Sequence, residues 1–190
     1  MAYIELEKHL PGITGLLEYR QDTAQAIRDL TEILMCGPSS LTKAEREIIA
    51  TFVSSKNKCT FCTAAHAAVV DALLDESLTC AAVIENYNTA PISPKLKALL
   101  VIAEKVQQNG KLVTESDILR AKELAATDLE IHDTVLISAL FCLYNKYVDG
   151  LSTYTPVNPE FYQKLGEKIK DHGYHRVPSA YEKMKEMKFD

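Results

Sequence analysis

Apolar residues recur along this chain every three to four positions, and no stretch alternates between apolar and polar residues as a half-buried strand does. This spacing is typical of amphipathic α-helices. A first helix over residues 22–35 has Asp22 and Gln25 at the spacing of a capping box, and it ends before Gly37 and Pro38. Further helices are predicted over residues 42–55, 59–74, 78–87, 93–109, from 114 onward, and over 127–149, 159–171 and 180–188. The pattern therefore predicts an all-α fold, a multi-helix bundle.

Two of these helices have especially clear starts. In a capping box, a Ser or Thr side chain accepts from the backbone N–H three residues later, and the Glu or Gln there bonds back. Thr42 and Glu45 have this spacing, and so do Thr127 and Glu130. Each pair precedes an apolar run, which raises the hypothesis of an internal helical repeat. The helix over residues 127–149 is apolar on nearly every side, so we expect it in the centre of the bundle or at a subunit interface.

Length and composition indicate one globular domain over residues 1–190. A chain of 190 residues with 47% hydrophobic and 25% charged residues can bury about 70% of the surface of its unfolded state. We expect a core motif within residues 47–66 and a C-terminal tail, residues 156–190, that packs on the bundle or on a partner subunit.

Charge and hydropathy narrow the class of partner and the location. The net charge of −5 argues against a nucleic-acid partner, because neutralising phosphates needs a basic face. The longest apolar runs fall short of the ~20 residues that cross a bilayer, and the N-terminus lacks a basic and then apolar secretory pattern. We expect a soluble, cytoplasmic protein without membrane contact.

Of the five cysteines, only Cys59 and Cys62 have a spacing that carries chemistry. In a reducing compartment, C-x-x-C indicates either redox chemistry or metal binding. Cys36, Cys80 and Cys142 each lie among apolar residues, and we interpret them as small buried hydrophobic side chains.

A histidine follows the cysteine pair on the same face of its helix. At ~100° per residue, Cys59, Cys62 and His66 share one stripe with the apolar residues that follow. Unpaired N–H groups and the helix dipole at a helix start stabilise a thiolate. His66 lies four residues after Cys62, so its imidazole could exchange a proton with the thiol. The alternative is an ordinary core histidine with a satisfied hydrogen bond.

Glu47 lies on the preceding helix, on a flank of small side chains. If the two helices fold back on each other at Asn57, this carboxylate could reach His66. The alternative is a solvated charge.

Other polar residues leave two interpretations open. Within the apolar helix, a narrow polar stripe either bonds between helices or lines a pocket around the thiols, and its members are Thr134, Ser138, Asn145 and Asp149. The remaining histidines have no metal-site spacing and are interpreted as surface or tail residues: His9, His132, His172 and His175.

The spacing Glu47, eleven residues, Cys59-x-x-Cys62, three residues, His66 resembles the core motif of the AhpD-like, carboxymuconolactone decarboxylase superfamily. Within it, the chain is most similar to the peroxidase-related branch, whose members have about this length. That similarity covers most of the chain and includes two late segments, residues 144–146 and 149–151.

The resemblance implies an AhpD-like helical bundle that assembles as a homo-oligomer, a dimer, trimer or hexamer, and acts as an alkylhydroperoxidase without a cofactor or metal. Cys62 would attack the hydroperoxide and become a sulfenic acid. Cys59 would protonate it or resolve it as a Cys59–Cys62 disulfide, which a thiol or protein reductant would then reduce. Glu47 and His66 would relay protons. One departure concerns Phe61, which stands where AhpD has an additional histidine between its cysteines.

Three alternatives to a peroxidase stay open. The decarboxylase branch of the superfamily works without the cysteine pair, so the pair favours redox chemistry. A metal module would use Cys59, Cys62 and His66, with Glu47 as a conceivable fourth ligand. A thiol switch or oligomeric adaptor would use the apolar helix and the long tail for its contacts.

Overall fold

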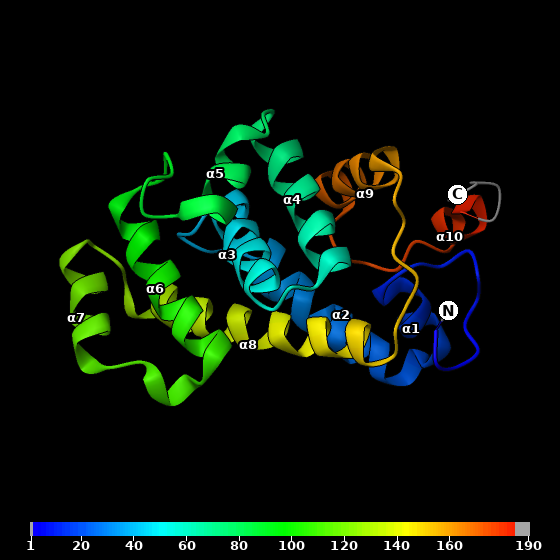
Figure 1. Ribbon diagram of the computed structural model, residues 1–190, viewed down its shortest axis with the longest axis horizontal. Coiled ribbons are helices and arrows are strands. Elements are labelled where there is room, and N and C mark those ends of the chain that lie inside the picture. The colour runs from blue at the N-terminus through cyan, green and yellow to red at the C-terminus, as the bar shows by residue number, and fades with distance from the viewer. Residues whose placement is uncertain (1, 185–190) are drawn as a thin grey trace.

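The computed structural model describes residues 2–184, which form ten α-helices, one short 3-10 helix and no strand (Figure 1). The elements are α1 (Ile13–Tyr19), α2 (Gln21–Cys36), α3 (Lys43–Lys56), α4 (Thr60–Leu74), α5 (Leu78–Asn86), α6 (Pro94–Gln108), η1 (Gly110–Leu112), α7 (Glu115–Glu123), α8 (Asp128–Gly150), α9 (Pro159–His172) and α10 (Pro178–Met184). The all-α prediction is confirmed, and α2 to α9 fall where the apolar periodicity placed them.

The predicted caps explain where several helices begin. Both capping boxes form, with the Thr42 hydroxyl 3.1 Å from the Glu45 amide nitrogen and the Thr127 hydroxyl 3.1 Å from the Glu130 amide nitrogen. Each box satisfies backbone N–H groups that a helix start otherwise leaves unpaired. The long α3 and α8 therefore start at residues that the sequence marks.

Other boundaries differ from the prediction. The capping box expected at Asp22 is wrong, because α2 starts one residue earlier and the Asp22 carboxylate instead pairs with Arg20 at 3.0 Å. Helix α6 ends at Gln108, one residue before the predicted end, and Asn109 is its C-cap. The short α1 was not predicted. The predicted helix over residues 180–188 corresponds to α10, which begins at Pro178, and residues 185–190 lie outside the described part of the chain.

Helix α3 is the central element. It packs against α4, α5, α6 and α8, while α8 runs along one side of the molecule beneath α3 and α6 (Figure 1). Between α3 and α4 the chain reverses within three residues, where Lys58 adopts a left-handed conformation with φ 61°. The expected fold-back at Asn57 is confirmed, and it lays α4 antiparallel to α3 along most of their length.

The apolar interior has two parts. The larger cluster lies between α3, α6 and α8, and the smaller one joins the start of α4 to the N-terminal segment and α9. Cys59 and Cys62 belong to the smaller cluster, together with Leu16 and Phe161. The thiols therefore lie where the two ends of the chain cover the central hairpin.

Helix α9 approaches α4 very closely because it has a glycine at the crossing. A Cβ on Gly166 would lie 2.4 Å from the Ala68 carbonyl oxygen and 2.7 Å from its carbon. Near the C-terminal end of α9, the Lys170 ammonium donates to the Ala72 carbonyl oxygen at 2.7 Å. This contact fixes α9, and with it the turn that follows, against the thiol-bearing helix.

None of the helices in the described range 2–184 combines the length and the apolar character needed to cross a membrane.

Replacing Gly166 by alanine tests the close approach of α9. The new methyl group meets backbone that cannot yield without separating the helices, and such overpacking costs about 1–3 kcal/mol. Alanine also gains about 1 kcal/mol in helix propensity over glycine. We expect Gly166→Ala to lower the free energy of unfolding in urea by up to about 2 kcal/mol. Gly150→Ala is the control, because nothing lies within 4 Å of its Cβ position. Equal effects of the two substitutions would contradict the proposed close packing.

Candidate active site

The cysteine pair lies at the start of α4, within the interior. Cys59 is the N-cap residue and is 0% exposed, while Cys62, in the first turn, is 3% exposed. The Cys59 amide donates to the Ser54 carbonyl oxygen at 3.1 Å, which anchors the first cysteine to the end of α3. Both are free thiols here. The prediction that the thiols and His66 share the core-facing side of this helix is confirmed, with His66 one turn further on.

The surroundings of the two thiols shift their pKa values in opposite directions. A hydrogen bond from Cys59 lowers the pKa of Cys62, and the His66 imidazole and the Asn145 amide lower it further, against the opposing effect of burial. The same hydrogen bond to Cys62 raises the pKa of Cys59, and burial raises it further. The negative charge therefore forms on Cys62 while Cys59 keeps its proton.

Glu47 is buried and reaches His66. One carboxylate oxygen, Oε2, lies 2.8 Å from His66 Nδ1, and the Glu47 residue is only 2% exposed. The expected contact across the hairpin is confirmed, and the interpretation of Glu47 as a solvated charge is wrong. The His66 ring also packs edge-on against Phe141 of α8, with centroids 4.5 Å apart. Because Nδ1 faces Glu47, Nε2 is the nitrogen left for a proton exchanged with Cys62 or with a substrate.

Tyr174 completes this group, and the sequence analysis missed it. Its hydroxyl donates to the other Glu47 oxygen, Oε1, at 2.5 Å and lies 3.3 Å from His66 Nδ1. Burial and then the Glu47 charge raise the pKa of Tyr174 well above its usual value, so the phenol stays protonated and keeps donating.

The turn after α9 places Tyr174. Gly173 ends α9 with φ 65°, and a Cβ there would lie 2.4 Å from a Glu32 carboxylate oxygen. The same carboxylate accepts from the Tyr174 amide at 2.7 Å, which ties the turn to α2. The glycine at the helix end was visible in the sequence, but nothing marked the tyrosine after it as part of the site.

Asn145 lies on α8 and links this helix to the end of α3 and to the Cys62 thiol of α4. Its amide nitrogen donates to the Ser54 hydroxyl at 3.1 Å, and its oxygen accepts from Asn57 at 2.8 Å. Of the polar stripe on α8, Thr134 and Ser138 instead bond to carbonyl oxygens of their own helix, at 2.7 and 2.6 Å. None of the four stripe residues lines the cavity described next. The interhelical interpretation thus holds for Asn145. Asn145 and Asp149 also form hydrogen bonds with Cys62 and Cys59, so part of the stripe surrounds the thiols without lining the cavity.

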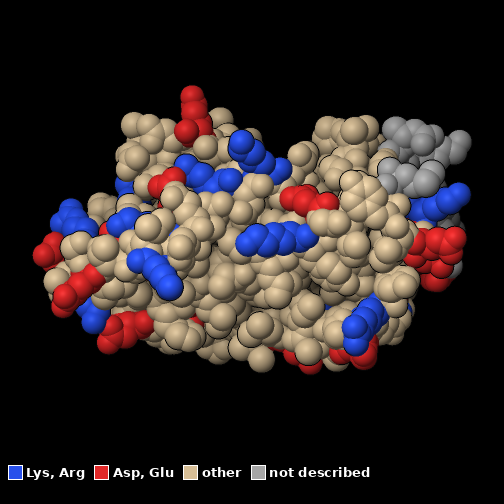
Figure 2. All heavy atoms as spheres, turned by 60° about the horizontal axis from the view of Figure 1, so that its bottom comes forward, with Lys and Arg blue, Asp and Glu red and all other residues tan. Residues whose placement is uncertain are grey.

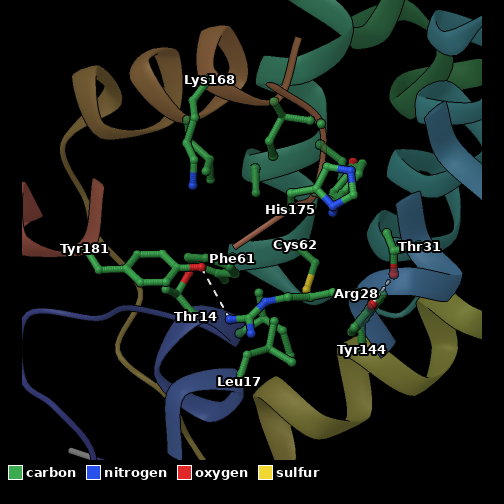
Figure 3. A pocket seen from close by; sticks show the side chains of 17 residues that line it. Thr14, Leu17, Arg28, Thr31, Phe61, Cys62, Tyr144, Lys168, His175 and Tyr181 are labelled. Atoms are coloured by element: carbon green, nitrogen blue, oxygen red, sulfur yellow. Dashed lines mark hydrogen bonds between the residues drawn. The ribbon is translucent and has the colours of Figure 1, made fainter. Parts of the chain in front are cut away.

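A cavity of about 100 Å³ opens beside Cys62 (Figure 3). Its walls come from α1, α2, α4, α8, α9 and the segment after α9. Cys62, His66 and Tyr174 line it, whereas Cys59 and Glu47 lie behind them. Of the two sulfurs, that of Cys62 is therefore the one that a molecule in the cavity meets.

The fold has close counterparts among solved structures. The crystal structure described as alkylhydroperoxidase AhpD core, an uncharacterized peroxidase-related protein from Ralstonia eutropha JMP134, matches with a TM-score of 0.74 and 30% sequence identity over 83% of this chain and 81% of that chain. The chain belongs to the AhpD-like, peroxidase-related family. An uncharacterized peroxidase-related protein from Silicibacter sp. TM1040 matches with a TM-score of 0.74 and 26% identity over 80% of this chain and 78% of that one. No protein-family model and no curated protein sequence matches the chain.

In this AhpD-like protein, Phe61 has a packing role between the two cysteines. Its ring lies near those of Phe161 and Tyr162, with centroids 6.5 and 6.2 Å apart, and a Cβ on Gly12 would come within 2.2 Å of it. Phe61 therefore joins α4 to α9 and to the N-terminal segment, and it contributes an apolar wall to the cavity.

The metal alternative gains no support from the geometry of this AhpD-like protein. Among residues 2–184, no group of three or more His, Cys, Asp or Glu side chains is arranged to hold a metal ion. His175, expected as a surface or tail residue, is largely exposed but also lines the cavity.

The other cysteines of this AhpD-like protein differ from the pair. Cys80 is buried as expected, whereas Cys36 and Cys142 are half-buried and pack against the larger cluster. Burial raises the pKa of Cys36 to about 11 and that of Cys80 to about 12. These two thiols stay protonated near neutral pH and are poor nucleophiles.

Because the pKa of Cys62 is lowered and that of Cys59 is raised, we expect alkylation to be selective for Cys62. With iodoacetamide and peptide mass spectrometry, we expect Cys62 to react with an apparent pKa below the usual ~8.5 of a cysteine, and Cys59 and Cys80 to stay unmodified at neutral pH. In Cys59→Ala the apparent pKa of Cys62 should rise, because the hydrogen bond that lowers it most is gone while burial remains. Cys80→Ser serves as the control and should leave it unchanged. Preferential labelling of Cys59 would contradict the assignment.

Proposed function

We propose that this AhpD-like protein is a thiol-dependent hydroperoxide reductase that cycles between the Cys59 and Cys62 dithiol and its disulfide. The observation that carries this proposal is the exposure of Cys62, the thiol with the lowered pKa, to a cavity that His66 also lines. The names of the two structural neighbours, both described as peroxidase-related, support the same class of reaction.

In the first step, the Cys62 thiolate attacks the outer oxygen of a hydroperoxide in the cavity. A sulfur–oxygen bond forms and the oxygen–oxygen bond breaks, so Cys62 becomes a sulfenic acid and the substrate leaves as an alcohol. The leaving alkoxide needs a proton, and His66 is the acid within the site that can supply it through Nε2. Glu47 stabilises the imidazolium through its 2.8 Å contact to Nδ1.

In the second step, the Cys59 sulfur attacks the Cys62 sulfur. A disulfide forms, the sulfur–oxygen bond breaks, and the hydroxide leaves as water after taking the proton of the Cys59 thiol. Cys59 suits this role because its thiol is the one that keeps its proton and because it lies behind Cys62, away from the cavity. An external thiol or protein reductant then returns both sulfurs to thiols.

The cycle suits a reducing compartment, so we retain the cytoplasm as the proposed location. We also propose that the protein forms a homo-oligomer. Helix α8 leaves Leu129, Val135 and Leu143 exposed, at 57, 36 and 46%. The side of the molecule along which α8 runs shows few charged side chains in its lower middle part (Figure 2). A second copy that covered this face would bury those side chains.

Peroxide turnover with a dithiol reductant tests the proposed reaction. We expect Cys62→Ser to abolish turnover, since no other thiol meets the cavity. Cys59→Ser should stop after the first step and accumulate a Cys62 sulfenic acid that dimedone traps. Cys80→Ser is the matched control and should turn over normally. Unchanged turnover in Cys62→Ser would exclude the mechanism. Oxidation to the disulfide without turnover would favour a thiol switch.

The proposed proton relay predicts that substitutions at His66 and Tyr174 lower peroxide turnover by different amounts. Removal of a general acid–base typically costs about 10²–10⁴-fold, and we expect a loss of this size in kcat/KM for His66→Ala. Tyr174 acts as a positioning residue, and a hydrogen bond to a charged group contributes about 1.5–3 kcal/mol, so Tyr174→Phe should lose about 10–100-fold. In both variants, alkylation also measures the apparent pKa of Cys62. A change in this pKa indicates a role in proton transfer, whereas a purely structural role would leave it unchanged. The prediction fails if His66→Ala leaves both the rate and that pKa unchanged.

A further inference from the structure

The cavity beside Cys62 has a distinctive charge. Among the described residues, its lining includes two cationic side chains, Arg28 and Lys168, and no aspartate or glutamate. The lining is therefore positively charged, although the whole chain has a net charge of −5. Lys168 points into the cavity from α9 and Arg28 from α2, and Cys62 lies close to the Arg28 side chain in the same view (Figure 3).

Arg28 is only partly neutralised. It is 5% exposed and donates to Glu18 at 2.7 Å and to the Tyr181 hydroxyl at 3.3 Å. The same Glu18 carboxylate also accepts from Arg176 at 2.7 Å. One carboxylate therefore serves two guanidinium groups, and this cluster keeps a net positive charge at the edge of the cavity.

Within the described residues, Lys168 forms no ion pair with a carboxylate. Its ammonium lies over the Tyr181 ring, 5.2 Å from the centroid. Burial lowers the pKa of Lys168, and the charge of Arg28 lowers it further. A half-buried ammonium of this kind is costly unless an anion joins it.

The remaining walls are apolar. Ile13 and Leu17 come from α1, Leu165 and Ile169 from α9, and Phe61 from α4. A ligand that fits both kinds of surface has a short apolar body and an anionic end. The limited volume, about 100 Å³, favours a short apolar body over a full lipid chain.

We infer that the cavity binds an organic hydroperoxide that carries a carboxylate, with the carboxylate held by Lys168 and Arg28 and the peroxide group at Cys62. This inference rests on the proposed function and adds the class of substrate. A carboxylate and an ammonium form a charge-assisted hydrogen bond, which is among the stronger polar contacts in a partly buried site. The reaction at Cys62 proceeds as above, and the carboxylate takes no part in bond changes.

A binding experiment tests the anion site without any turnover. Octanoate and octanamide have the same apolar chain and differ in charge, and calorimetry measures the affinity of each for the full chain. We expect octanoate to bind at least about tenfold more tightly, the difference that one charge-assisted contact typically makes, and to protect Cys62 from iodoacetamide. Lys168→Met should remove the preference. Lys164→Met is the matched control on the same helix, since Lys164 is exposed and pairs with Glu160 at 2.7 Å.

Equal affinity for the two ligands, or an unchanged preference in Lys168→Met, would overturn the anion site. A preference for octanoate without protection of Cys62 would also overturn it, because the carboxylate would then bind elsewhere.

Turnover separates this inference from the proposed function. With a medium-chain hydroperoxy acid and its methyl ester as substrates, we expect kcat/KM to favour the acid by about tenfold, chiefly through KM, and the ratio to approach one in Lys168→Met. Equal turnover of acid and ester would overturn the substrate class and leave the peroxidase function intact. If neither is reduced, the proposed function fails, and calorimetry alone still supports or overturns the anion site.

Discussion

The buried carboxylate of Glu47 is the constraint on which the rest of the site depends. A carboxylate removed from water is costly unless hydrogen bonds compensate for its lost hydration. Here the two oxygens take separate partners, His66 from α4 and Tyr174 from the turn after α9. Elements separated by more than a hundred residues must come together to satisfy this one charge. The demand for partners therefore helps to specify how the C-terminal part of the chain lies on the central hairpin.

The same arrangement makes the two cysteines different. Cys59 caps the start of α4 and Cys62 lies in its first turn, and both are the same type of residue. In the fold, the hydrogen bond from Cys59 contributes most to stabilising the charge on Cys62, and His66 and Asn145 add to it. Cys59 keeps its proton behind its neighbour, in surroundings that disfavour a second negative charge. One thiol is thereby prepared as a nucleophile and the other as a proton donor, as a dithiol cycle requires.

The charges that line the cavity suit the proposed anionic substrate. A protein with an overall negative charge places Arg28 and Lys168 around a largely apolar space. Arg28 shares the Glu18 carboxylate with Arg176, and Lys168 forms no ion pair with a carboxylate of the described residues. The cost of holding these cations away from water is recovered only when a negative group enters. Phe61, which departs from the family pattern, contributes packing between α4, α9 and the N-terminal segment and an apolar wall. The site thus combines a thiolate, a proton relay and a cationic, apolar pocket.

The sequence by itself determined the helices and the chemistry of one helix face. Capping boxes at Thr42 and Thr127 and the 3.6-residue apolar period are local signals, so they could be read without the fold, as could the shared face of the thiols and His66. Local signals also misled where two helices abut, because the spacing at Asp22 fits a cap that a helix starting at Gln21 does not use. Only the tertiary structure decided that Glu47 is buried, that Tyr174 joins it, and that Lys168 and Cys62 line one cavity. These relations join residues far apart in the chain, and neither spacing nor periodicity encodes which distant side chains meet in a packed interior.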